Sequence, residues 1–163
     1  MKNKAILLTS IIICTLIVII SFILMKAHIN IDMEADIKNL DNDIITNLEL
    51  STEPKENYKV FHFELKIKHD NKITQRHVVI PDFRELIDSS GEKIYWFGTY
   101  SIQDDPKQNF AKYTYDITLN VGQLSEEDIR KIFNSQDFTI SWHNEKDKFI
   151  EQRYKLGDLI KFK

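Results

Sequence analysis

The feature that most constrains this chain is an uncharged stretch of 21 residues near its start, Ala5 to Met25. As a helix rising about 1.5 Å per residue it is roughly 31 Å long, matching the hydrocarbon core of a bilayer at about 30 Å. A cleaved secretory signal usually has a shorter apolar stretch and ends at a small-x-small site. Here the stretch ends in Met25-Lys26-Ala27, with a large side chain at the first small position. We therefore expect an uncleaved transmembrane helix over Ala5–Met25.

The single cysteine of the chain, Cys14, lies inside this stretch. Bacterial lipoprotein signals place Gly, Ala or Ser directly before the lipidated cysteine, whereas the bulky Ile13 holds that position here. The residues from Thr15 to Met25 are also largely apolar, where the polar mature chain of a lipoprotein would begin. We interpret Cys14 as an apolar membrane residue, which leaves no cysteine for a disulfide in the rest of the chain.

Charges that flank the stretch predict its orientation. Lys2 and Lys4 precede it, whereas Lys26 and His28 follow it. Because positively charged flanks stay on the cytoplasmic side, we expect residues 1–4 to form a cytoplasmic stub and the C-terminal part to lie outside. The expected location is the cell membrane, in a single pass, with the lipid bilayer as one partner. A disulfide-free external part rich in Lys, Ile and Asn is typical of a Gram-positive bacterium.

Composition limits the nature of the external part. All 25 acidic residues but only 20 of the 22 Lys and Arg follow the apolar stretch, so this part is mildly acidic. Nucleic-acid-binding domains usually carry a basic face, so we expect no nucleic-acid partner. The remaining length suits one domain of common size. We expect residues 26–42 to form a polar, irregular stalk and residues 43–163 to form an extracytoplasmic β-rich domain.

Alternating apolar and polar residues dominate the domain. The clearest case runs from Tyr58 to Ile80, where two alternating segments flank Asp70-Asn71, two residues that favour tight turns. A hairpin with that turn has a register that keeps apolar residues opposite each other. It pairs Phe61 with Ile80, Phe63 with Val78, and Glu64 with His77.

Further segments complete the expected fold. Strands are predicted near residues 93–102, 111–121, 137–143, 149–156 and 159–162, with short helices over 82–87 and 125–134. About seven short strands with one or two helices indicate a mainly β fold, an antiparallel β-sandwich that is immunoglobulin-like in the loose sense. The alternative is an α+β fold, an open antiparallel sheet with the helices packed on one side.

One cluster of the predicted hairpin has metal-ligand chemistry. His62 and Glu64 share the polar face of their strand, and the register brings His77 opposite Glu64. Two imidazoles and a carboxylate form a ligand set that Zn²⁺ accepts. The competing interpretation is a solvated strand face with a single Glu–His pair. We adopt the competing interpretation and expect no metal and no cofactor.

A run of aromatic residues is the second candidate site. Trp96 and Tyr100 share one strand face with Ile94 and Ile102, so we expect them in the core. Tyr95 and Phe97 point the other way. They would form a partner-binding patch if exposed, or more core if the helix over residues 82–87 covers them.

The sequence contains no phosphate-binding loop, no cysteine pair and no spacing typical of a catalytic triad. We therefore expect a non-enzymatic function, that of a membrane-anchored binding or accessory module for another envelope protein or a surface ligand. One alternative is a small structural subunit that assembles with a membrane complex through its transmembrane helix. Another is a metal-dependent extracytoplasmic enzyme built on the histidine cluster.

Overall fold

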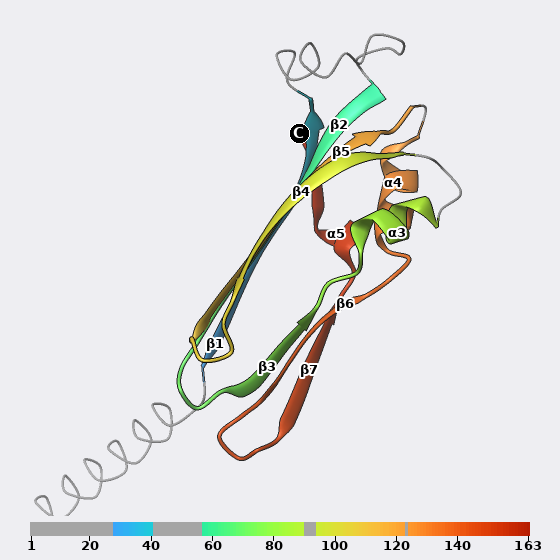
Figure 1. Cartoon of the computed structure of the whole chain (residues 1–163). Helices are drawn as coiled ribbons and strands as arrows, with labels where there is room; N and C mark the ends of the chain where they lie inside the picture. Colours follow the sequence, from blue (N-terminus) through green and yellow to red (C-terminus); the bar gives the residue numbers. More distant parts are fainter. Residues whose placement is uncertain (1–27, 41–56, 90–93, 123) are drawn as a thin grey trace, which may run out of the picture.

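The computed structural model describes residues 28–40, 57–89, 94–122 and 124–163. In this part the chain is mainly β, with eight strands in two sheets and three short helices, which confirms the predicted class (Figure 1). No helix within these ranges is long and apolar enough to cross a membrane. The expected span Ala5–Met25, with Cys14, lies outside the described residues and stays a prediction.

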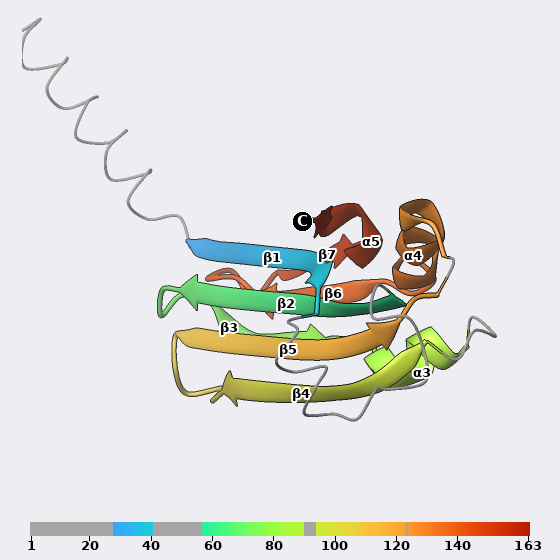
Figure 2. The same cartoon turned by 90° about the horizontal axis from the view of Figure 1, so that it is seen from above.

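The two sheets differ in width. The larger has five strands in the spatial order β4 (Tyr95–Asp104), β5 (Phe110–Asn120), β2 (Tyr58–His69), β1 (Ile29–Asn39) and β8 (Ile160–Phe162). The smaller has three, in the order β3 (Thr74–Val79), β6 (Phe138–His143) and β7 (Phe149–Tyr154). Seen from above, the broad sheet lies in front of the narrow one, and the helices gather at one end of both (Figure 2).

Strand β1 corrects one prediction. The expected irregular stalk over residues 26–42 is wrong for Ile29–Asn39, which pairs along its whole length with β2. The signal was present, because every second residue from Ile29 to Ile37 is apolar. Charged residues between them occupy the outer sheet face, which is why the segment has the polarity of a stalk although Ala35 and Ile37 are buried.

The predicted hairpin is also wrong. Both edges of β2 are taken, one by β1 and the other by β5, so β3 leaves this sheet and pairs with β6 in the smaller one. Asp70 and Asn71 do lie in the connection, but among the described non-glycine residues positive φ occurs only at Gln75 and Asp147. The connection therefore lacks the backbone of a tight hairpin turn and instead links one sheet to the other.

The core lies between the two sheets. Phe61 and Phe63 of β2 are fully buried and contact rings from two of the helices and from the smaller sheet. Their ring partners include Phe133, with its centroid 4.4 Å from that of Phe61, and Phe138, with its centroid 5.8 Å from that of Phe63. Burying such rings supplies much of the apolar area that drives folding.

Three helices close one end of the molecule. Both predicted helices are confirmed as α3 (Phe83–Asp88) and α4 (Glu126–Phe133), and α4 has the expected capping box between Ser125 and Asp128. The third, α5 (Leu156–Leu159), leads into β8. Strand β8 runs parallel to β1, so the predicted all-antiparallel pairing is wrong for this one pair.

Candidate functional site

The structure does not bring the predicted metal ligands together. His62 lies on the outer face of the larger sheet, where its Nδ1 is 2.7 Å from the Asp116 carboxylate. Glu64 binds Lys112 at 2.6 Å and also Lys66, and hydrogen bonds from these two amines lower the pKa of its carboxyl. His77 lies in the smaller sheet, opposite Ser141. Within the part of the chain that the structure describes, no group of three His, Cys, Asp or Glu side chains is placed to hold a metal ion.

The aromatic run of β4 differs from expectation. Ile94 is buried as predicted, but Tyr100 is 73% exposed and Ile102 is 48% exposed, so their assignment to the core is wrong. Phe97 is 37% exposed, in keeping with one of the two predicted arrangements. The side chains of Tyr95 and Trp96 lie outside the described residues.

Sheet width explains this exposure. The apolar face of β4 points toward the smaller sheet, but that sheet has only three strands and none of them lies opposite β4 (Figure 2). Alternation in the sequence correctly groups Tyr100 with Ile102 on one face. It does not say whether another element covers that face.

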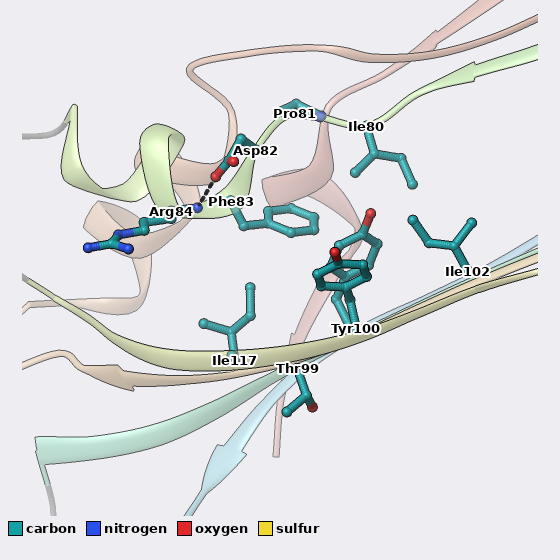
Figure 3. A pocket seen from close by; sticks show the side chains of 11 residues that line it. Ile80, Pro81, Asp82, Phe83, Arg84, Thr99, Tyr100, Ile102 and Ile117 are labelled. Atoms are coloured by element: carbon teal, nitrogen blue, oxygen red, sulfur yellow. Dashed lines mark hydrogen bonds between the residues drawn. The ribbon is translucent and has the colours of Figure 1, made fainter.

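The uncovered face forms one wall of a groove with a volume of about 450 Å³, which we call the β4 groove (Figure 3). The opposite wall is the connection from β3 into the first turn of α3. The groove residues are mostly apolar and come from both walls: Ile80, Pro81, Asp82, Phe83 and Arg84 on one side, and Gly98, Thr99, Tyr100, Ile102, Tyr115 and Ile117 on the other.

The helical wall is fixed by local sequence. Pro81 cannot donate to a sheet and lies two residues beyond Val79, where β3 ends. The Asp82 carboxylate then accepts hydrogen bonds from the backbone N–H groups of Arg84 at 2.8 Å and Glu85 at 3.1 Å, which starts α3. Phe83 anchors the helix, since its buried ring packs edge-on against Tyr115 at 4.9 Å.

Two tyrosines of the sheet wall, Tyr100 and Tyr115, supply aromatic rings to the groove. Tyr100 stacks on Tyr115 with ring centroids 5.9 Å apart. Burial, with smaller contributions from Tyr100 and Asp82, raises the pKa of Tyr115, so its hydroxyl stays protonated at neutral pH. The groove therefore offers aromatic faces together with hydroxyl groups, and its only carboxylate already caps a helix. This chemistry suits binding by apolar contact and a few hydrogen bonds.

The groove runs beside a strand whose outer edge has no partner strand among the described residues. Strand β4 pairs with β5 alone, and its stretch from Phe97 to Gln103 contains no charged residue and no proline. Edge strands are usually protected against pairing by charges, prolines, bulges or short length. The other edges have such protection: β8 is three residues long, β3 contains a bulge, and β7 carries Glu151 and Arg153. The bulge in β4 lies before Phe97, so the rest of the strand is regular.

A buried polar network is the other notable cluster, and the sequence analysis missed it. The Arg76 side chain is only 2% exposed and donates to the Asp104 carboxylate, to His69 Nε2 at 2.6 Å and to the Gln108 carbonyl at 3.1 Å. Tyr113 donates to the second Asp104 oxygen. Since a guanidinium only donates, His69 Nε2 accepts and its Nδ1 donates to the Asp70 carbonyl. The network joins β3 of the smaller sheet to β2, β4, β5 and the β4–β5 connection of the larger one, so we interpret it as structural.

Tyr113 makes the stability of the protein sensitive to alkaline pH. Burial, followed by the hydrogen bond to Asp104 and the charge of that carboxylate, raises the pKa of Tyr113 well above its ordinary value of 10.0. The unfolded chain then loses this proton first as the pH rises through about 10, while the folded chain keeps it. Titration of Tyr113 should therefore leave the free energy of unfolding unchanged below that pH, and lower it above that pH by at most about 1.4 kcal/mol per pH unit.

Urea unfolding of the full chain in detergent micelles between pH 8 and pH 11.5 measures this effect, with a Tyr113→Phe variant as the matched control. The variant loses a hydrogen bond at every pH, but its curve should fall less steeply above pH 10. Parallel curves for the two proteins would contradict the assignment.

Comparison of the chain with protein-family models, with curated proteins and with solved structures finds no match. Function therefore has to be argued from the geometry of the site.

Proposed function

We propose that this protein is a single-pass membrane protein whose external domain, a loosely immunoglobulin-like β-sandwich, is a non-catalytic binding module. Its ligand is an extended segment of another envelope protein, which docks in the β4 groove. One observation carries this proposal: an apolar groove lies directly beside the uncharged, unprotected part of an edge strand.

The two features call for the same kind of ligand. An edge strand offers a row of backbone N–H and C=O groups, which an extended peptide satisfies by pairing as a further strand. The side chains of such a peptide alternate between the two sheet faces. Every second one would point toward Tyr100, Ile102 and Phe83, where it gains apolar contact. The outer face of β4 carries no charged residue between Phe97 and Gln103, so it sets no charge requirement on the others.

Site-specific photocrosslinking tests the proposal on the full chain in its own cells. A photoreactive phenylalanine analogue at Ile102 should give an adduct with one defined protein, mapped to an extended segment. The same analogue at Glu127, which is exposed on α4, should not. Adding Tyr100→Lys should weaken the adduct at least about tenfold, because it places a charge in the groove. It should leave the thermal midpoint nearly unchanged, since this side chain is 73% exposed.

Equal adducts at both positions, or no adduct at Ile102, would reject the groove as the binding site. An adduct that survives Tyr100→Lys would show that the partner contacts the domain elsewhere.

A further inference from the structure

The end of the domain opposite the helices is built from turns. It contains His28 and the connections of residues 70–73, 105–109 and 144–148, a set that we call the turn end (Figures 1 and 2). Direct contacts join the connections to each other: Asn109 bonds Asn71, and Lys72 lies 3.6 Å from Glu145. The turn end is therefore one surface and not a set of separate loops.

The chain enters the domain through this surface at a fixed point. The His28 backbone N–H donates to the Asp70 carboxylate at 2.9 Å, and the Asp70 N–H donates to the His28 carbonyl at 3.1 Å. The first strand begins at the next residue, Ile29. These bonds tie the entry point to the β2–β3 connection, so the linker before the domain ends at His28.

The length of that linker is a strong constraint. Only Lys26, Ala27 and His28 separate the apolar stretch from β1, and three extended residues span at most about 11 Å. The headgroup region on each side of a bilayer is roughly 5–7 Å thick, from the difference between its total and hydrocarbon thickness. A linker of this length barely clears the headgroups.

We propose that the turn end rests against the phospholipid headgroups of the membrane that anchors the chain. This inference rests on the transmembrane part of the proposed function. Its surface chemistry fits that position, because acidic and basic groups are interspersed and lysines such as Lys107, Lys146 and Lys148 are exposed. Phe149, beside the last of these turns, is 55% exposed and supplies an aromatic ring at interface depth.

This placement also limits the ligand of the β4 groove. Tyr100 lies four residues along β4 from Asp104, where the turn end begins, so it is about 13 Å from that end at about 3.3 Å per residue. A segment that binds the groove must therefore approach within a few tens of ångströms of the same bilayer.

Fluorescence quenching in vesicles tests the inference on the full chain. In a Cys14→Ala background, single cysteines at Lys146, in the turn end, or at Glu127, on α4, receive the same fluorophore. The protein is then reconstituted into phosphatidylcholine–phosphatidylglycerol vesicles that contain a lipid with a quencher on its headgroup. Quenching at Lys146 should exceed that at Glu127 at least about threefold, because a β-strand of eleven residues, roughly 36 Å, separates the two ends.

A flexible insert provides the matched control. About twelve Gly and Ser residues between Ala27 and His28 should release the domain and lower the quenching at Lys146 toward the value at Glu127. Flotation of the vesicles separates the two proposals. Protein that floats but is quenched equally at both positions overturns the placement of the turn end alone, whereas protein that does not float overturns the anchor as well.

Discussion

Replacing Arg76 with leucine is expected to lower the free energy of unfolding by about 4 kcal/mol, since removing one partner of a buried ion pair leaves the other charge uncompensated. The Asp104 side chain is only 19% exposed and would keep Tyr113 as a donor but lose its countercharge. His69 and the Gln108 carbonyl would lose a donor as well. Urea unfolding of the full chain in detergent micelles at pH 7 measures the change.

A double-mutant cycle separates the loss of charge pairing from the loss of packing. Asp104→Asn in the Arg76→Leu background removes the uncompensated charge, so the double variant should be more stable than Arg76→Leu alone. The exposed pair of Arg153 and Glu151 is the control, and Arg153→Ala should change stability by less than about 1 kcal/mol. If Arg76→Leu behaved like this control, the network would not be what holds the two sheets together at the turn end.

The network depends on the pairing partner of β3, which the sequence pattern does not identify. The predicted hairpin pairs the segment that ends at Ile80 with β2, and this register gives Arg76 no buried polar partner. The register of the predicted hairpin places apolar residues opposite apolar residues. Alternation, however, identifies only the buried face of a strand and not the strand that pairs with it. The pairing of β2 in this protein depends on β1. The polar residues between Ile29 and Ile37 favour the prediction of a stalk for this segment instead of a strand. With β1 and β5 on both sides of β2, β3 had to cross to the other sheet.

The candidate site was only partly predictable for a related reason. The sequence correctly groups Tyr100 with Ile102 on one strand face, but it assigns its candidate pair, Tyr95 and Phe97, to the opposite face, and Phe97 does not line the groove. The pattern predicts that the face of Tyr100 lies in the core, because an apolar face is normally covered by another element of the fold. Whether a partner exists depends on how many strands the second sheet contains, which is a property of the whole fold. The helix over residues 82–87 was predicted, but its role as the opposite wall of a groove was not.

Replacing Gly157 with alanine is expected to be the second strongly destabilising change, lowering the free energy of unfolding by about 3 kcal/mol, at the upper end of the usual cost of overpacking. A Cβ at this position would lie 2.2 Å from the Arg130 carbonyl oxygen and 2.7 Å from Asn134 Oδ1. The carbonyl belongs to the backbone of α4, so it cannot rotate away. The helix α5 would have to move away from α4. This movement would break the hydrogen bond that the Arg130 guanidinium donates to the Gly157 carbonyl at 2.7 Å.

The consequence should extend to the C-terminal strand. Strand β8 follows α5 directly, pairs with β1, and places Phe162 under the Arg130 guanidinium at 5.0 Å. Thermal unfolding of the full chain should therefore show a midpoint lower by about 10 °C for a domain of this size. Gly122→Ala is the matched control, because a Cβ there meets nothing within 4 Å; its left-handed φ alone should cost about 1 kcal/mol.

A second variant decides which contact is responsible. Asn134→Ala removes the side-chain oxygen near Gly157 but leaves the Arg130 carbonyl in place, so it should not restore stability to Gly157→Ala. Restoration would mean that the Asn134 side chain, and not the backbone of α4, sets the close approach of the two helices. Stability of Gly157→Ala equal to that of the unaltered protein would show that α5 can shift without loss. In that case β8 would not depend on this contact to stay beside β1.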